Sequence, residues 1–181
     1  MSHLQGGIAV ITGAASGFGL ESCRIAARLG MRIVMADVQA DALAAAQREI
    51  EALGAPVLPF RLDVSKAVEV EALAAATLQR FGTPHFVFNN AGVGAGGLIW
   101  EHTLKDWEWV IGVNLMGVAH GVRVFTPLML AVLTMSPRQA GSACAAPVSA
   151  ASSPQAPSSP RSMTPARSSS ISPCPSGSWR R

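Results

Sequence analysis

Tyrosine is absent from this chain, and lysine occurs only twice among its 181 residues, at Lys66 and Lys105. The absence excludes any mechanism in which a tyrosine of this polypeptide exchanges a proton with a substrate. Acidic residues stop early, because all 11 lie between Glu21 and Glu108. Residues 1–108 carry eight basic and 11 acidic side chains, whereas residues 109–181 carry six basic side chains and no acid. The isoelectric point near 9.1 comes from the second part alone and does not indicate a nucleic-acid-binding domain.

Cysteine is scarce, and its spacing matches no metal or disulfide pattern. The three thiols belong to Cys23, Cys144 and Cys174. An odd number without a secretory signal predicts reduced thiols and a cytoplasmic location. The scattered histidines His85, His102 and His120 have no acid or cysteine partners in the sequence, so no metal site is predicted.

Long apolar runs are also missing. No run reaches the roughly 18 residues that span a bilayer, and the N-terminus MSHLQGG has no signal-peptide core. The sequence therefore predicts neither a membrane nor a nucleic-acid partner.

The sequence does contain a regular alternation of apolar, β-branched runs and helical segments. Strands are expected in GGIAVITGA, MRIVMAD, PVLPFRLDV and PHFVFNNAG, with Pro59 weakening the third or placing it at a sheet edge. Helices are expected in SGFGLESCRIAARLG, ALAAAQREIEALG and KAVEVEALAAATLQRFG, followed by one long helix over residues 103–130. This order predicts an α/β fold: a Rossmann-like, doubly wound parallel sheet that is incomplete, with about four strands.

The composition changes abruptly near Leu133. Residues 134–181 contain 14 Ser, 8 Pro, 8 Ala and 5 Arg. Such a segment buries too little apolar surface to offset its ordering entropy. We expect a partial dinucleotide-binding domain over residues 1–131 and a disordered or frameshifted tail over residues 132–181.

A glycine-rich turn, TGAASGFG, connects the first strand to the first helix. Its glycines, Gly13, Gly17 and Gly19, follow a G-x3-G-x-G spacing. Such a turn lets backbone N–H groups approach a pyrophosphate at a helix N-terminus. Cofactor-binding residues are therefore expected in this turn, and they include Ser16 and Phe18. A glycine turn of purely structural origin is the alternative.

Asp37 ends the second strand, 18 residues beyond Gly19. A carboxylate there can accept hydrogen bonds from adenosine ribose hydroxyls and repels a 2′-phosphate. The sequence therefore predicts NAD in preference to NADP. The alternative is that Asp37 only caps the next helix.

With these motifs, residues 6 to about 130 resemble the classical short-chain dehydrogenase/reductase family. The resemblance also rests on the pair Asp63–Val64 after the third strand, on NNAG at residues 89–92, and on Asn114 within WEWVIGVNLMGV. It implies that Asp63 and Val64 contact the adenine, and that Asn90, Ala91 and Gly92 line the cofactor. It further implies that Asn114 helps to hold a water in a proton relay. The alternative for Asn114 is a helix-interior residue that bonds locally. Trp100, Trp107 and Trp109 are expected to pack the long helix.

The same resemblance implies hydride transfer between a nicotinamide and a small alcohol or carbonyl substrate. The family uses a tyrosine with a lysine four residues later, and this pair is missing. We therefore expect this chain to be inactive as written. Family members form homo-oligomers through such long helices, but this is doubtful for a chain that lacks the later strands.

Codon arithmetic offers an origin for the tail. If each shifted codon starts at the third base of a tail codon, Met163 followed by Thr164 forces an aspartate, and residues 162–167 permit Tyr-Asp-Ala-Ser-Lys. We hypothesise that the tail results from a frameshift, or from an equivalent error in splicing or gene prediction. The alternative is a genuine disordered tail.

Two functions remain open: an NAD-dependent oxidoreductase represented by an incomplete chain, or a non-catalytic nucleotide-binding or interaction module with a disordered tail.

Overall fold

The architecture is a four-stranded parallel sheet. A computed structural model describes residues 4–134, with side chains to residue 131. Of the tail predicted over residues 132–181, residues 132–134 continue the last helix, and the rest lies outside the described residues. The strands are β1 (Ile8–Thr12), β2 (Arg32–Asp37), β3 (Val57–Arg61) and β4 (Phe86–Phe88), in the order β3-β2-β1-β4. All three strand pairings are parallel, with Val10 opposite both Val34 and Val87. The prediction of a doubly wound α/β fold is confirmed, and Pro59 lies in an edge strand as expected.

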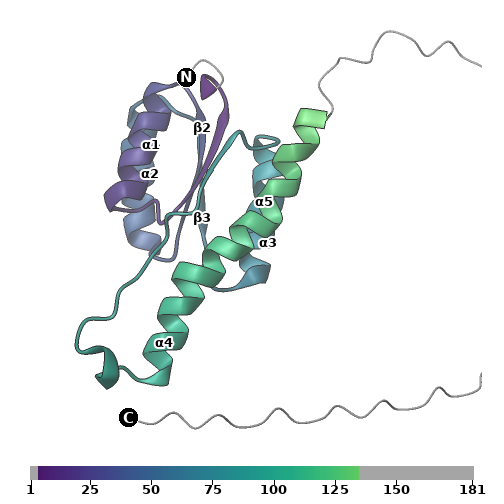
Figure 1. Cartoon of the computed structure of the whole chain (residues 1–181). Helices are drawn as coiled ribbons and strands as arrows, with labels where there is room; N and C mark the ends of the chain where they lie inside the picture. Colours follow the sequence, from purple (N-terminus) through teal and green to yellow (C-terminus); the bar gives the residue numbers. More distant parts are fainter. Residues whose placement is uncertain (1–3, 135–181) are drawn as a thin grey trace, which may run out of the picture. The chain divides into compact units, whose positions relative to one another are not determined.

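Helices cover both faces of the sheet (Figure 1). One face carries α1 (Gly17–Arg28) and α2 (Ala40–Ala52), and the other carries α3 (Ala67–Arg80) and α5 (Gly117–Thr134). The two cores follow from strand alternation. Ile11, Ile33 and Met35 pack toward α1 and α2, whereas Val10 and Val34 pack in the second core with residues of α3 and α5.

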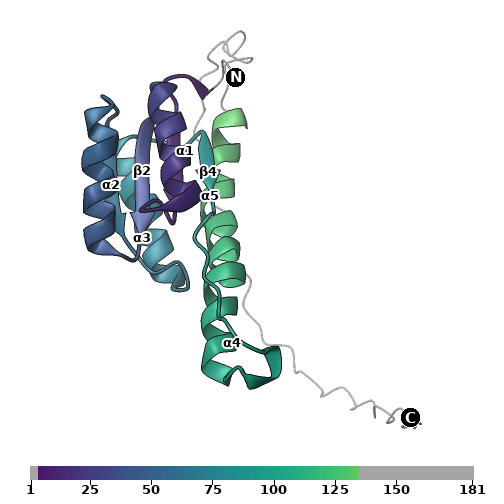
Figure 2. The same ribbon diagram turned by 90° about the vertical axis from the view of Figure 1, so that its left-hand side faces the viewer.

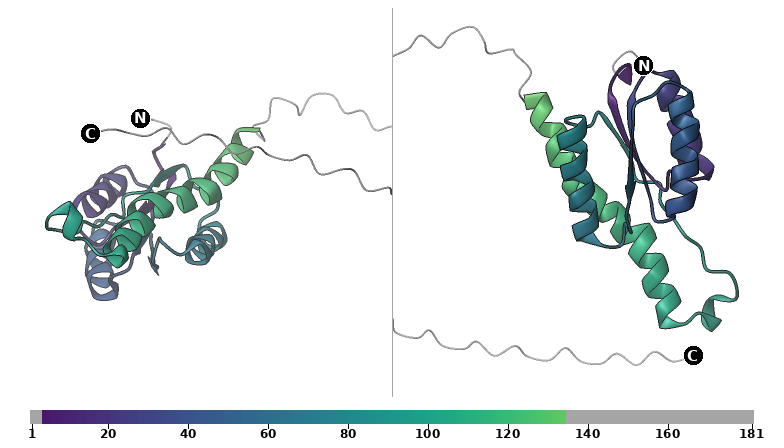
Figure 3. Two further views of the ribbon diagram at one scale, coloured as in Figure 1. Left: turned by 60° about the horizontal axis from the view of Figure 1, so that its bottom comes forward. Right: turned by 180° about the vertical axis from the view of Figure 1, so that it is seen from behind.

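The long helix predicted over residues 103–130 is present but is not uniform. It consists of α4 (Leu104–Ile111), a π-helical segment η3 (Gly112–Met116) and α5, which follow one another without a break. Thr103 begins it with a capping box, since its hydroxyl accepts from the Asp106 N–H and the Asp106 carboxylate accepts from the Thr103 N–H. The α4 end extends beyond the sheet (Figures 1 and 3). The π segment was not predicted, because five residues are too few for a change of periodicity to be recognised in the sequence.

The same helix also has the length and composition of a membrane span. Over Leu104–Ala131 it reaches a mean hydropathy of 1.2 in an 18-residue window, so by length and composition it could cross a bilayer. The absence of an uninterrupted apolar run therefore does not exclude a span. A core helix of a soluble protein passes the same test.

Several apolar side chains are more exposed than the sequence suggests. Trp100 lies in a short 3₁₀ helix, η2 (Ile99–Glu101), and is 77% exposed, so the expectation that it packs the long helix is wrong. Trp107 and Trp109 are also exposed. Phe18 is 84% exposed at the start of α1, outside the buried face.

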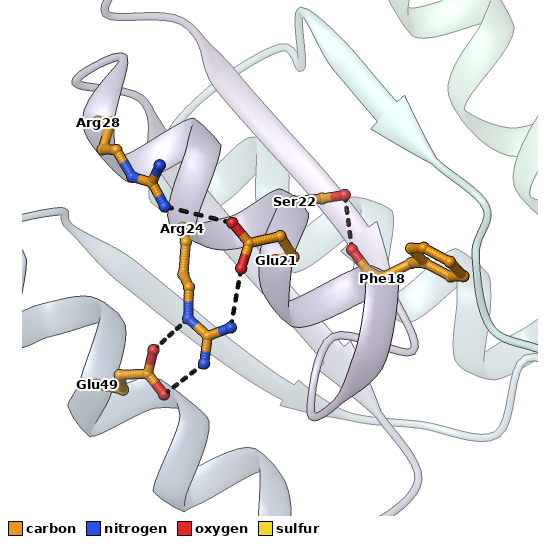
Figure 4. A network of polar contacts seen from close by, with 6 residues as sticks. All are labelled: Phe18, Glu21, Ser22, Arg24, Arg28 and Glu49. Atoms are coloured by element: carbon orange, nitrogen blue, oxygen red, sulfur yellow. Dashed lines mark hydrogen bonds and ion pairs between the residues drawn. The ribbon is translucent and has the colours of Figure 1, made fainter.

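An ion-pair network fastens α1 to α2 at the surface. The Arg24 guanidinium contacts Glu49 of α2 at 2.5 Å and Glu21 of its own helix at 2.9 Å, and Arg28 also contacts Glu21 (Figure 4). The pKa values of Glu21 and Glu49 are lowered, chiefly by hydrogen bonds from Arg24. These pairs are exposed, so each contributes little to stability.

Candidate functional site

A cleft of about 400 Å³ opens at the carboxyl ends of the strands. Parallel strands bring their carboxyl ends to one edge, and the loops that follow them build the site. The lining residues are Gly13, Ser16, Ala36, Asp37, Val38, Gln39, Leu62, Asp63, Val64, Asn90, Ala91, Gly92, Val93, Trp109 and Val113. Each of the four motif regions noted in the sequence, from the glycine turn to NNAG, contributes to this list.

The glycine turn forms one side of the cleft, next to the N-terminus of α1. Ser16 is the extended residue before the helix, and the first turn of α1 contains no acid. A Cβ on Gly19 would collide with the carbonyl oxygen of Gly13, so only glycine permits this close turn. The positive end of the α1 helix dipole, with backbone N–H groups that no side chain shields, favours an anion here. Gly17, Phe18 and Gly19 were predicted to contact the cofactor, but they are not among the lining residues.

Asp37 is fixed at the end of β2 by two backbone donors. Its Oδ2 accepts from the Ala15 N–H at 3.0 Å and its Oδ1 accepts from the Gln39 N–H at 3.0 Å. The side chain therefore supports both the glycine turn and the residue before α2, and the N-cap of α2 is Gln39 rather than Asp37. Asp37 is 8% exposed and lines the cleft, and each carboxylate oxygen keeps capacity for a further donor.

The loop after β3 supplies a second wall. The Asp63 N–H donates to Glu69 at 2.7 Å, and the Ser65 N–H and hydroxyl both donate to Asp63 Oδ1. The pKa of the Glu69 carboxyl is lowered, first by the Asp63 backbone N–H and then by Lys66. These bonds hold Asp63 and Val64 at the cleft.

Asn90 connects the ends of β1 and β4. Its Nδ2 donates to the carbonyl oxygens of Thr12 and Gly13, at 3.0 and 3.2 Å. The Thr12 hydroxyl accepts in turn from the N–H groups of Asn90 and Ala91. The Asn90 side chain thus shapes the glycine turn, while Ala91 and Gly92 line the cleft with it.

Asn114 lies in the π-helical segment and bonds across the cleft wall. Its Oδ1 accepts from the Val93 N–H and its Nδ2 donates to the Val93 carbonyl, both at 2.8 Å. The local-bonding alternative for Asn114 is therefore wrong, because its partner is 21 residues away. Asn114 touches the site through Val93, which lines the cleft.

Sequence reasoning missed several lining residues. Trp109 and Val113 face the cleft from the long helix, and their four-residue spacing could have suggested a shared face. Val93 directly follows the predicted Gly92, and Gln39 lies two residues after the predicted Asp37; this proximity was the only available signal. Trp109 also lines a second cavity of about 370 Å³ with the Gly94–Leu98 loop, Glu101, His102 and Asp106. Within residues 4–134, no group of three His, Cys, Asp or Glu side chains could hold a metal.

Comparisons with known proteins agree with this geometry. A family model described as short chain dehydrogenase matches residues 7–150. A C alpha-dehydrogenase of Sphingobium sp. strain SYK-6 is 39% identical over 161 residues, covering 83% of this chain and 52% of the relative. The chain spans about half the length of the curated relatives it matches.

Two solved structures are similar in fold and sequence. A short chain dehydrogenase/reductase from Burkholderia phymatum, in complex with NAD, is 55% identical with a TM-score of 0.71, over 73% of this chain and 47% of that chain. L-Sorbose reductase from Gluconobacter frateurii, complexed with NADPH and L-sorbose, is 32% identical with a TM-score of 0.67, over 71% and 49% of the two chains.

Proposed function

Because this chain belongs to the short chain dehydrogenase family, we propose that its cleft binds a nicotinamide dinucleotide. The observation that carries the proposal is the joint arrangement of the glycine turn at the start of α1 and the fixed Asp37 carboxylate in one cleft. Glycines without Cβ atoms and a helix N-terminus suit a pyrophosphate, and a carboxylate acceptor suits ribose hydroxyls. The site therefore fits the group that the family uses.

Each wall of the cleft has a part in binding. Asp37 would orient the adenosine ribose, and the Asp63–Val64 loop would hold the adenine. The wall toward the nicotinamide would be formed by Ala91, Gly92 and Val93, and Asn114 holds Val93 in place. When bound, the nicotinamide would supply or accept a hydride with a small alcohol or carbonyl compound.

We propose NAD rather than NADP as the preferred dinucleotide. The sign of the charge supports this preference, because Asp37 and Asp63 line the cleft and no described lining residue is basic. A 2′-phosphate beside Asp37 would be repelled. The proposal places the protein in the cytoplasm, on the basis of its cysteine content.

Catalysis in the family manner is not expected from this polypeptide, because it has no tyrosine. The cleft, combined with this absence, favours, as a second candidate, a nucleotide-binding module without turnover. The two candidates are separated by incubating the 181-residue protein with NADH and a panel of ketones and aldehydes. Oxidation of NADH that depends on the carbonyl compound would reject the non-catalytic module. Binding without oxidation would support it.

The missing pair leads to a proposal about the gene. We infer that a reading frame adjacent to the one for residues 162–167 encodes Tyr-x-x-x-Lys. The nucleotide sequence decides this directly. If neither neighbouring frame encodes a strand-like segment followed by that motif, the frameshift is rejected, and the serine- and proline-rich sequence is a genuine tail.

The preference for NAD has a sharp test in Asp37→Ser. We expect NAD to bind at least about tenfold more weakly, since charge-assisted hydrogen bonds to the ribose are lost. NADP should lose less, because the repulsion also disappears and Arg61, whose Nε donates to the Val38 carbonyl at 3.3 Å, stays near the site. Isothermal titration with both dinucleotides measures the ratio. Asp41→Ser, at an exposed acid in the first turn of α2, is the matched control. An unchanged NAD/NADP ratio in Asp37→Ser would contradict the assignment.

A further inference from the structure

His120 of α5 touches the cleft wall through one hydrogen bond. Its Nδ1 lies 3.0 Å from the carbonyl oxygen of Val64, 56 residues earlier in the chain. A carbonyl oxygen can only accept, so Nδ1 carries the proton in this bond. Val64 is a cleft-lining residue and is 8% exposed. The imidazole thus satisfies a backbone acceptor in a nearly buried part of the wall.

The helix also approaches Val64 from a second side. A Cβ on Gly117 would come within 2.7 Å of Val64 Cγ2, so the helix backbone lies directly against the valine side chain. Asp63 is held separately, by Glu69 of α3. Val64 is therefore fixed by α5 on both its side chain and its carbonyl, while its neighbour is fixed by α3.

We infer that His120 is a positioning residue for the dinucleotide, acting through the Val64 carbonyl. This inference rests on the proposed function, because it assumes that the cleft beside Val64 receives the cofactor. His120 does not line the cleft. Its effect is to hold Val64 in the wall proposed to receive the adenine, so its loss weakens binding without removing a direct contact. Asn114, six residues earlier, holds Val93 through its amide, and the two side chains connect the long helix to two walls of one cleft.

The test compares three variants of the full 181-residue chain. His120→Leu keeps a similar volume but has no donor, and we expect NAD to bind about tenfold more weakly, the order of effect for one hydrogen bond to a desolvated acceptor. His120→Asn places an amide N–H near the position of Nδ1 and should restore most of the affinity. Arg123→Met is the matched control on the same helix, because Arg123 pairs with Glu71 of α3, away from the cleft. It should leave NAD affinity unchanged.

Titration calorimetry gives the NAD dissociation constants, and thermal melting of the dinucleotide-free protein gives stability. A purely structural role for His120 would lower the melting temperature of His120→Leu and leave NAD affinity equal to that of the wild type among folded molecules. That result, or a failure of His120→Asn to restore affinity, would overturn the inference. Failure of the wild-type chain to bind NAD would instead reject the proposed function, and this inference with it.

A measurement on the wild type covers the case in which His120→Leu does not fold. Long-range ¹H–¹⁵N spectra report which ring nitrogen of His120 carries the proton. We expect a protonated Nδ1, and we expect the His120 ring signals to shift when NAD is added. A ring with an unprotonated Nδ1, or signals that do not respond to NAD, would overturn the inference.

Discussion

At the scale of single residues, the site depends on side chains whose partners are backbone atoms. Asp37 accepts from two N–H groups, Asn90 donates to two carbonyls, and Asn114 uses both ends of its amide on Val93. Because the partners are backbone N–H and C=O groups, these contacts fix the conformation of the loops themselves. Substituting one of these residues should therefore move a wall of the cleft as well as remove a polar group.

Gly19 gives the most direct test at this scale. We expect Gly19→Ala to destabilise the protein by about 3 kcal/mol, the upper range for a clash in a packed region, because the added Cβ would meet the Gly13 carbonyl oxygen. NAD binding should be lost together with stability. Urea unfolding followed by circular dichroism measures the change.

The matched control for Gly19→Ala is Gly96→Ala. A Cβ at Gly96 meets no atom within 4 Å, so this variant should unfold at the wild-type urea concentration. Equal unfolding midpoints for the two alanine variants would show that the turn relaxes freely around position 19.

At the scale of elements, the capping box of α4 makes one helix end sensitive to pH. Hydrogen bonds from Thr103, with a smaller contribution from His102, hold the pKa of the Asp106 carboxyl below its usual value. A carboxyl whose pKa is depressed by folding stabilises the folded state above its unfolded pKa. That contribution is lost as pH falls through the lower, folded pKa.

We therefore expect the start of α4 to fray in acid, below the ordinary aspartate pKa of 3.8. Hydrogen exchange of the Asp106 amide, followed by NMR across this range, measures the opening. Thr103→Ala should open the same turn at neutral pH, at a cost of about 1 kcal/mol for a lost N-cap. If exchange at Asp106 does not depend on Thr103, the cap does not hold the helix end.

Most of the helices and strands, and the position of the cleft, could be predicted from the sequence. The features that could not be predicted have physical causes. Strands β1 and β2 were predictable because buried parallel strands are continuous apolar runs. The glycine spacing and Asp37 indicated where the cleft lies, because the close turn requires glycine and the Asp37 carboxylate accepts backbone N–H groups. The π segment was not predictable, since a single widened turn is too short for its periodicity to be recognised. The exposure of Phe18 and Trp100 was missed because hydrophobicity predicts burial only on average. The lining role of Trp109 depends on where α4 projects, which local sequence does not specify.

At the scale of the whole molecule, apolar surface is distributed unevenly. The long helix exposes Ile111, Leu115, Met116, Val118 and Val122, among others. Within residues 4–134, β4 pairs only with β1, so its second edge has no strand partner. Figure 2 shows β4 and α5 at the same side of the domain. Both features expose groups that associate readily in water.

We expect the purified chain to self-associate and to be poorly soluble. Sedimentation velocity over a range of concentrations measures the association. Leu115→Glu, at a residue 61% exposed, should reduce it, whereas Glu101→Gln outside the long helix should not. A monodisperse monomer at high concentration would contradict the expectation.

Cys23 reports whether the domain folds as one unit. Cys23 belongs to α1 and its side chain is fully buried in the core, and burial raises the pKa of its thiol to about 12. In a variant with Cys144→Ser and Cys174→Ser, we expect Cys23 to resist a thiol reagent at neutral pH until urea unfolds the domain. Modification as fast as that of a small-molecule thiol would show that this core opens freely.

The hydrogen bonds between Thr12 and Asn90 also bear on the order of folding. They join residues 78 positions apart, whereas β1 and β2 pair across a much shorter segment. Contacts across long loops form late, because the loop entropy must be overcome first. During synthesis, the glycine turn therefore emerges well before the segment that fixes its shape. The cleft is completed only when the fourth strand joins the sheet, so a dinucleotide bound as proposed would favour that last step.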